Sequence, residues 1–426
     1  MRKFETSKQF AIDMDNKDPL RSFKERFYVK PGTIYMDGNS LGLCSRDAER
    51  YLLEALENWK THGIDVWSHP DVNYFLYQDK LGELTAPLIN AKPSEVTICT
   101  NTTINIHKAL ATFYRPTKER YKIIVDDLNF PTDRYAVDSQ VKLHGYSIED
   151  AVRVVRSRDG KNIFEDDMIE AMTDDVCLIL LPSVLYRSSY LVDMKKIADA
   201  ARAKGIYVGF DLSHSIGSVP HDFSRIQPDF AVWCSYKYLN GGPGAIAGLY
   251  INEKHFKLGP GLAGWHGNKK ETQFDLNQTF EPSEYAGAWQ TGTQPIFSMA
   301  PIEGSLRMFA EAGLENIRAK SLNITAYLMY LIDEKLRKYG FSYGNPTDDE
   351  RRGGHVALEH DDAIRINKAL KGRGVVPDFR YPNVIRLAPI AFYVSYEDVF
   401  NLVDIIIDIM ETKEYEKYDG NRGTVA

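Results

Sequence analysis

Apolar and polar positions change their period along the chain, and the central part has the pattern of alternating strands and helices. Short apolar runs of strand length are separated by stretches in which apolar residues recur every three or four positions. We predict strands at residues 96–100, 122–125, 152–155, 176–181, 205–211, 230–234 and 245–251. The run at 176–181 is apolar throughout, which is typical of a strand covered on both faces. This series predicts an α/β fold, a mostly parallel central sheet flanked by helices.

The segment before this series has a helical pattern. Residues 46–60 are predicted to form an amphipathic helix, and residues 71–90 a second helix. The apolar face of the first helix consists of Leu52, Leu53, Leu56 and Trp59.

After the strand series the pattern changes twice. Residues 259–295 are rich in glycine, tryptophan and polar side chains, which predicts a functional loop rather than a linker. A long helical stretch is predicted from 296 to 337. A smaller α/β unit follows, with strands predicted at 354–358, 374–376 and 384–387 and helices at 361–371 and 396–411.

These patterns predict three parts. The first is an N-terminal arm at 1–45, which contributes to the small domain and the active site. The second is a large ligand-binding domain at 46–295. The third, at 296–426, is a linking helix with a small C-terminal α/β domain.

Composition narrows the class of protein. The net charge of −7 and the absence of a basic cluster argue against a nucleic-acid partner. The four cysteines lie far apart and form no CxxC pair, so we expect neither a metal site nor a disulfide framework. The N-terminal residues are polar, and no apolar run approaches membrane-spanning length. We therefore expect a cytoplasmic enzyme without a membrane partner.

Residues 234–244, Cys-Ser-Tyr-Lys-Tyr-Leu-Asn-Gly-Gly-Pro-Gly, place Lys237 after a buried strand and before a glycine-rich turn. Lysine is rarely buried without a partner or a purpose. The position suggests a lysine that forms a Schiff base with a ligand. The alternative is a lysine at a strand end whose amine simply extends into solvent.

Asp211 ends the strand before that of Lys237, so the two side chains can be neighbours at the carboxyl edge of the sheet, where ligands bind. Pyridoxal phosphate requires such a pair, because its aldehyde condenses with a lysine and its pyridine nitrogen must stay protonated beside a carboxylate. Other roles stay open. Asp211 can cap the turn at Ser213, and His214 can contact the ring or be a polar residue at a helix start.

Hydroxyl-rich turns indicate where an anion could bind. Asn101-Thr-Thr103 lies between a strand and a helix, a combination that forms an anion site but also serves plain helix capping. We expect Phe130–Asp133 and Ser183 at the same edge. The dinucleotide, P-loop and zinc-protease motifs are missing, which disfavours nicotinamide, ATP and zinc mechanisms.

Several long motifs together resemble the kynureninase family of fold-type-I pyridoxal-phosphate enzymes, whose fold is related to that of class V aminotransferases. They are Met36-Asp-Gly-Asn-Ser-Leu-Gly42, Phe130-Pro-Thr-Asp133, Phe210-Asp-Leu-Ser-His214, Cys234-Ser-Tyr-Lys-Tyr-Leu-Asn240, Gly264-Trp265 and Ile385-Arg-Leu-Ala-Pro389. The resemblance covers nearly the whole chain. It implies hydrolysis of L-kynurenine to anthranilate and L-alanine (EC 3.7.1.3), and less readily of 3-hydroxykynurenine, in tryptophan catabolism and NAD biosynthesis. It also implies a homodimer with shared active sites.

The resemblance implies a role for each matching residue. Lys237 would bind pyridoxal 5'-phosphate and move the α-proton, and Tyr236 would be a proton donor. Asp211, assisted by Asp133, would face the pyridine nitrogen. Further cofactor contacts would come from Phe130, which would stack on the ring, and from Thr102, Thr103, His214, Tyr236, Trp265 and Thr293, where Trp265 and Thr293 belong to the other subunit. The substrate would be bound by Arg386, at its α-carboxylate, and by Trp67, Asn39, Ser40 and His266.

The chain departs from the family pattern near the aromatic wall of the site. His266 stands where the family often has phenylalanine, and it can change the wall or add a titrating group. The stretch around Thr293 also differs from the expected pattern. Trp67 and Thr293 together resemble the bacterial pattern, which favours L-kynurenine over 3-hydroxykynurenine. The alternative for Trp67 is core packing.

A related fold-type-I enzyme, an aminotransferase or a cysteine desulfurase, is the main alternative. A desulfurase needs a nucleophilic cysteine in a late loop, and the last cysteine of this chain is Cys234. A binding protein that has kept only the fold is a further alternative. The intact set of Lys237, Asp211 and Arg386 argues against it.

Overall fold

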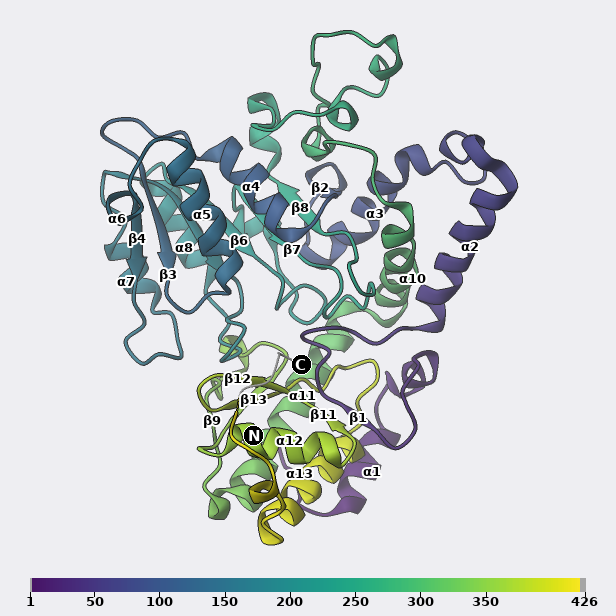
Figure 1. Ribbon diagram of the computed structural model, residues 1–426, viewed down its shortest axis with the longest axis vertical. Helices are drawn as coiled ribbons and strands as arrows, with labels where there is room; N and C mark the ends of the chain where they lie inside the picture. The colour runs from purple at the N-terminus through teal and green to yellow at the C-terminus, as the bar shows by residue number, and fades with distance from the viewer. Residues whose placement is uncertain (1, 422–426) are drawn as a thin grey trace.

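The computed structural model describes residues 2–421, and its core is a seven-stranded sheet (Figure 1). The sheet order is β2-β8-β7-β6-β5-β3-β4. The strands are β2 (Val96–Ile98), β3 (Lys122–Asp126), β4 (Val152–Val155), β5 (Val176–Pro182), β6 (Tyr207–Asp211), β7 (Phe230–Trp233) and β8 (Gly248–Ile251). Neighbouring strands from β4 to β7 run parallel, and β8 runs antiparallel to β7 and β2. The predicted α/β fold with a mostly parallel sheet is confirmed.

Helices cover both faces of this sheet because side chains alternate along each strand. Ile123 and Val125 share one buried cluster with α4 (Thr102–Phe113) and α5 (Pro131–Leu143), whereas Ile124 belongs to the cluster that contains α8 (Met194–Ala203). The shorter helices of this region are α6 (Ile148–Ala151), α7 (Glu165–Glu170) and α9 (Phe223–Ile226).

A second, smaller sheet lies in the lower part of Figure 1 and has the order β12-β13-β10-β9. Its antiparallel strands are β9 (Ser342–Tyr343), β10 (Val356–Glu359), β12 (Asp378–Arg380) and β13 (Val384–Leu387). It is accompanied by α11 (Leu314–Leu331), α12 (Ala363–Gly372) and α13 (Tyr396–Glu411). The sequence predicted β10, β13 and both later helices, but not β9 or β12.

The N-terminal arm is bound to this smaller unit. Strand β1 (Ile34–Tyr35) pairs in parallel with β11 (Val375–Val376). Helix α1 (Lys8–Asn16) carries Asp15, whose carboxylate accepts the backbone N–H groups of Tyr396 and Glu397 at 2.7 and 2.9 Å. The arm thus caps the first turn of α13, where a carboxylate stabilises the unpaired N–H groups of a helix. The domain limits at 45 and 295 stay a prediction.

Two predictions about helices are wrong. The helix predicted over 296–337 is divided into α10 (Ile296–Ala312) and α11 by Gly313, whose φ of +76° is left-handed and ends a right-handed helix. The helix predicted at 71–90 is shorter, since α3 spans Tyr77–Thr85 between two 3-10 turns.

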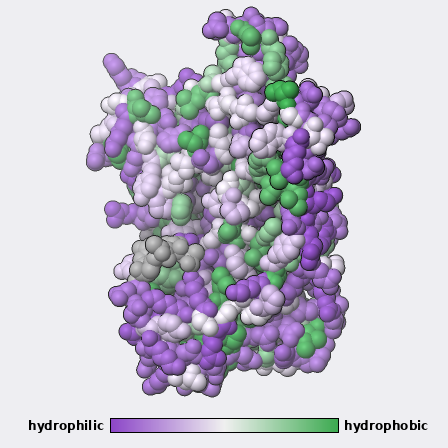
Figure 2. All heavy atoms as spheres, turned by 45° about the vertical axis from the view of Figure 1, so that its right-hand side comes forward, coloured by the Kyte–Doolittle hydropathy of each residue, from purple (hydrophilic) through white to green (hydrophobic). Residues whose placement is uncertain are grey.

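Helix α2 (Arg46–His62) forms as predicted, but its apolar face does not pack inward. Leu53 and Trp59 are 56% and 58% exposed, and Leu52 and Leu56 are also exposed. Figure 2 shows this side of the molecule, where hydrophobic side chains gather among polar ones. No helix described between residues 2 and 421 combines the length and the apolar character needed to cross a membrane.

Candidate active site

A cavity of about 260 Å³ lies at the carboxyl edge of the central sheet, where the arm and the smaller unit meet the large one. Its walls bring together side chains from distant parts of the sequence. Those predicted to form a site are Asn39, Ser40, Thr102, Thr103, Phe130, Asp211, His214, Tyr236, Lys237 and Arg386. Asp133 lies directly behind this wall, next to Asp211.

Lys237 lies in the loop after the buried strand β7, and the arm holds this loop in place. The N–H of Gly42 donates to the carbonyl of Tyr236 at 2.8 Å. A Cβ on Gly42 would lie 2.5 Å from the carbonyl oxygen of Lys237, so only glycine permits this approach. The glycine of the arm motif therefore positions the lysine loop.

The amine of Lys237 faces His214 and Phe130. Its Nζ lies 3.0 Å from Nε2 of His214 and 5.9 Å from the centre of the Phe130 ring. Burial, and next the charge of Lys237, hold the pKa of His214 well below its usual range. His214 is thus neutral at pH 7 and can accept a hydrogen bond from the amine of Lys237. Phe130 leaves 43% of its surface exposed, which makes a ring face available to a ligand.

Two carboxyl groups form the floor of the cavity. Asp211, at the end of β6, accepts the N–H of Ser213 at 2.7 Å, and Asp133 accepts Nδ2 of Asn129 at 2.7 Å. Burial raises the pKa of Asp211, and burial together with the neighbouring Asp211 raises the pKa of Asp133. Within residues 2–421, Oδ1 of Asp133 has no hydrogen-bond partner. A buried pair of carboxyls in which one oxygen lacks a partner suits a cationic ring nitrogen.

The opposite end of the cavity suits an anion. Helix α4 begins at Thr102, and its N-cap residue Asn101 uses its side chain to accept the N–H of Ile104 at 3.0 Å. The hydroxyls of Thr103 and Thr132 lie 2.8 Å apart. Because the side chain of Asn101 caps this 12-residue helix, Thr102, Thr103 and the first N–H groups of the helix stay available for a phosphate.

Arg386 lies on β13 with its side chain only 1% exposed. Its Nε donates to Oδ2 of Asp378 at 2.7 Å, its Nη1 to the carbonyl of Tyr186 at 2.9 Å, and its Nη2 to the hydroxyl of Ser40 at 2.8 Å. Ser40 comes from the arm, so the predicted carboxylate-binding arginine is oriented by three separate segments.

Tyr236 keeps its phenolic proton at neutral pH. The neighbouring Cys234, and next burial, raise the pKa of Tyr236. A phenol that holds its proton can donate a hydrogen bond or a proton into the cavity.

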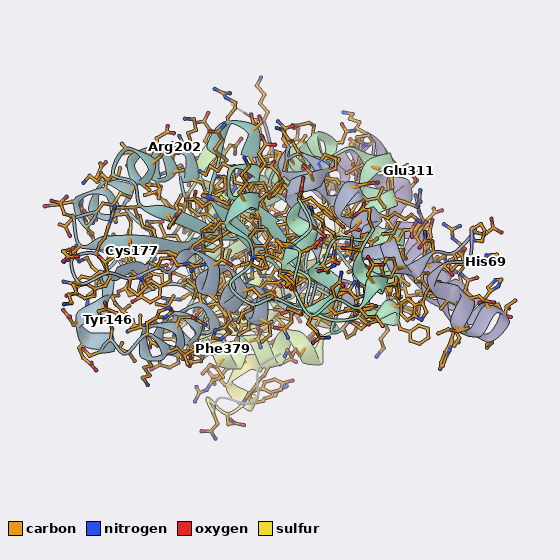
Figure 3. The ribbon with its side chains drawn as sticks, turned by 90° about the horizontal axis from the view of Figure 1, so that it is seen from above. His69, Tyr146, Cys177, Arg202, Glu311 and Phe379 are labelled. Atoms are coloured by element: carbon orange, nitrogen blue, oxygen red, sulfur yellow. The ribbon has the colours of Figure 1, made fainter. Side chains whose placement is uncertain are left out.

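Besides Asp133, four predicted site residues do not line this cavity. Trp265 is 43% exposed and Thr293 is exposed. Trp67 is half-buried and packs against the core, and it lies two residues from His69, which Figure 3 places at the outer edge of the molecule. A single chain therefore does not bring these side chains to Lys237.

His266, the fourth, is buried rather than part of the cavity wall. Its Nδ1 lies 3.3 Å from Nε2 of Gln78, and its ring lies 5.6 Å from that of Phe75. Burial, and next the charge of Lys270, lower the pKa of His266 to about 4. The ring is therefore neutral at pH 7.

The cavity also contains residues that the sequence did not single out, namely Asn129, Thr132, Pro182, Val184, Tyr186, Ser213 and Arg380. Thr132 lies inside the motif at 130–133, and Tyr186 lies in the loop after β5, so position alone could have suggested both. Arg380 lies on β12, which was not predicted, and no sequence signal pointed to it.

Comparison with known proteins gives one consistent family. Residues 317–406 match the kynureninase C-terminal domain. The kynureninase of Geobacillus thermodenitrificans is 52% identical over 422 residues, which is 99% of both chains. That of a Bacillus cereus strain is 52% identical over 423 residues, again 99% of both chains. That of Shouchella clausii is 48% identical and covers 99% of this chain and 98% of its own.

Solved structures share the fold at low identity. A cysteine desulfurase from Thermococcus onnurineus aligns with a TM-score of 0.77 at 15% identity, over 92% of this chain and 98% of its own. A mutant of C-DES with glycine covalently linked to its PLP cofactor aligns with a TM-score of 0.76 at 16% identity, over 90% of this chain and 98% of its own.

Proposed function

The chain belongs to the kynureninase family, and we propose that it hydrolyses L-kynurenine to anthranilate and L-alanine with pyridoxal 5'-phosphate (PLP) as cofactor. The observation that carries this proposal is the meeting of Lys237, Asp211 and Arg386 in one cavity. The amine of Lys237 matches the aldehyde of PLP, and the carboxylate of Asp211 matches its pyridine nitrogen. The guanidinium of Arg386 matches the α-carboxylate of the substrate.

The residues of the cavity fit PLP at each of its functional groups. The start of α4 with Thr102 and Thr103 would hold the phosphate, and the exposed face of Phe130 would stack on the ring. Oδ1 of Asp133, beside Asp211, has no hydrogen-bond partner within residues 2–421, and a protonated pyridine nitrogen would give this carboxyl pair a cationic partner. When bound, PLP supplies an electron sink that makes the α-proton of the amino acid labile.

Lys237 would bind the cofactor aldehyde and then hold and return protons at the α-carbon. Neutral His214, 3.0 Å from its Nζ, would hold this amine by accepting a hydrogen bond from it. Tyr236 would donate a proton, because its phenol stays protonated at neutral pH. Arg386 would bind the α-carboxylate, and water would add to the aryl ketone before the carbon–carbon bond breaks.

We also propose a homodimer in which each subunit completes the site of the other. Trp265, Thr293 and Trp67 lie away from Lys237 within one chain, although the family pattern makes them site residues. The exposed apolar face of α2 supports a subunit contact, since contiguous exposed apolar side chains are typical of interfaces. Phe297 extends this face, with its ring 5.7 Å from that of Trp59. The cytoplasmic location and the role in tryptophan catabolism stay predictions.

The proposed reaction is tested by incubating the PLP-loaded protein with L-kynurenine. We expect anthranilate fluorescence to rise with equimolar release of L-alanine, and a lower rate with 3-hydroxykynurenine. An amino transfer that depends on an added 2-oxo acid, or sulfide release from L-cysteine, in place of anthranilate would contradict the proposal and favour one of the related enzymes.

A further inference from the structure

The hydrogen bonds of Arg386 are nearly all used by the protein itself. A guanidinium has five N–H groups. Three of them donate to Asp378, Tyr186 and Ser40, and Nη2 also contacts Oδ2 of Asp378. This leaves one N–H, on Nη1, without a contact to an acceptor in residues 2–421. One free N–H cannot form the paired hydrogen bonds by which arginine usually grips a carboxylate.

Arg380 is a second guanidinium on the wall of the same cavity, and its donors are unused. Its Nε lies 2.9 Å from Oδ2 of Asp378, yet within residues 2–421 its side chain donates no well-aligned hydrogen bond. Both arginines lie against one aromatic ring, with their guanidinium carbons 6.0 and 5.9 Å from the centre of Tyr186. The two cations are therefore held side by side at one end of the cavity.

A single carboxylate anchors both cations. Oδ2 of Asp378, a residue with no exposed surface, contacts Arg380 and Arg386 together. Burial, and next the charge of Arg386, lower the pKa of Arg380, which reflects a positive charge with too little compensation. Asp37 is a further carboxyl near both arginines, and burial, and next Asp378, raise its pKa to about 6, so it loses its charge as the pH falls below this value. Oδ2 of Asp378 thus holds both guanidiniums, and a substrate carboxylate at this end of the cavity would give them a second acceptor.

We propose that Arg380 and Arg386 bind the α-carboxylate of the substrate as a pair, and that Asp378 is the positioning residue that holds both guanidiniums. This inference rests on the proposed function. In this arrangement Arg386 contributes its remaining Nη1–H, and Arg380 contributes terminal N–H groups that bind no acceptor among residues 2–421. Neither arginine alone offers the full set of donors.

The test uses two ligands that cannot react with Lys237. One is the kynurenine analogue that lacks the α-amine but keeps the aryl ketone and the carboxylate. The other is the aryl ketone that also lacks the carboxylate. Dissociation constants are measured by calorimetry on the PLP-loaded protein, so that binding is read without turnover. Parent, Arg380→Gln, Asp378→Asn and Arg373→Gln proteins are compared, the last removing an exposed guanidinium paired with Asp408 and Glu414 on the smaller unit.

We expect Arg380→Gln to weaken binding of the carboxylate ligand about tenfold to hundredfold, to leave the ketone unchanged, and to raise KM for L-kynurenine far more than it lowers kcat. Asp378→Asn should show the same selectivity, and Arg373→Gln should match the parent. If Arg380→Gln weakens the binding of both ligands equally, or of neither, the proposed arginine pair is refuted. Arg380→Gln decides the question even if Asp378→Asn does not fold. A parent protein that binds the carboxylate ligand but makes no anthranilate would refute the proposed function and leave the pair to be judged by the binding data.

Discussion

At the scale of single residues, the cavity is a set of charged groups with incomplete partners. Asp133 and Asp211 are buried carboxyls with raised pKa values, and within residues 2–421 the amine of Lys237 has a neutral imidazole as its sole hydrogen-bond partner. Such groups cost free energy until an oppositely charged ligand arrives. PLP offers a cation to the carboxyls and a phosphate to α4, so its binding should stabilise the protein.

Asp211→Asn removes the charge that favours a protonated pyridine nitrogen. We expect the dissociation constant of PLP to rise about tenfold to hundredfold, because a charge-assisted hydrogen bond becomes a neutral one. Titration of PLP into the cofactor-free protein measures this. Asp138→Asn is the matched control, since Asp138 lies on the same helix as Asp133 but pairs with Arg134 outside the cavity. Equal affinities for the Asp211 variant and the parent would rule out the role of Asp211.

His266→Phe should change how stability depends on pH. The pKa of His266 is about 4 in the folded state and about 6.5 in an unfolded chain, so its contribution is fully present above pH 6.5 and is lost as the pH falls toward 4. The loss is on the order of 2 kcal/mol of unfolding free energy. Denaturant unfolding at several pH values should give a shallower acid-side slope for His266→Phe and His266→Gln than for the parent. Identical slopes would show that His266 titrates normally.

Sequence reasoning succeeded for site residues that follow strands and failed for those that depend on distant packing. Asp211, His214 and Lys237 were placed at one sheet edge because consecutive parallel strands end there. Arg380 and Asp378 could not be found in this way. Their role depends on β12 pairing with β13, and a three-residue strand has too little periodicity to be seen.

At the scale of elements, the arm motif works because two of its glycines let neighbouring segments approach the arm closely. A Cβ on Gly38 would lie 2.2 Å from the hydroxyl of Tyr393, and one on Gly42 would lie 2.5 Å from the carbonyl oxygen of Lys237. The first contact fixes the arm to the smaller unit and the second fixes it to the lysine loop. The turn between them carries Asn39 and Ser40 into the cavity.

Gly42→Ala should therefore displace the lysine loop. We expect kcat to fall at least about tenfold, since a shift of the order of 1 Å in a reacting group costs that much or more. Far-ultraviolet circular dichroism should stay unchanged. Gly420→Ala is the control, because a Cβ there meets only the far end of Arg365 at 3.9 Å. If Gly42→Ala keeps full kcat, the arm does not position Lys237.

The prediction of helices was limited by what the apolar period along the sequence can show. Helix α13 was predicted at its observed limits, and in the structure it begins at a capping box formed by Ser395 and Asp398. The break at Gly313 was missed because the apolar period resumes at once in α11, so a single left-handed residue is invisible to periodicity. For α2 the period was right, but Leu53 and Trp59 on its apolar face stay more than half exposed.

At the scale of the whole molecule, the proposed dimer needs two chains for one complete site. Lys237→Ala and Trp265→Ala proteins should each be inactive as pure homodimers. Mixed under conditions that exchange subunits, half of the dimers are hybrids, and each hybrid has one intact site, so about one quarter of the parent activity should return. Sedimentation measures the dimer, and anthranilate fluorescence measures the activity. No recovery in a mixture shown to contain hybrids would exclude shared sites.

Removal of the Lys237 amine tests the proposed reaction most directly, by comparing the parent with Lys237→Ala in the conversion of L-kynurenine to anthranilate. Both proteins are loaded with PLP, and circular dichroism establishes that both are folded. We expect sustained anthranilate fluorescence from the parent and none above background from Lys237→Ala, because this amine binds the cofactor and moves the α-proton. Sustained turnover by folded Lys237→Ala would contradict the proposed function of this lysine and the reaction built on it.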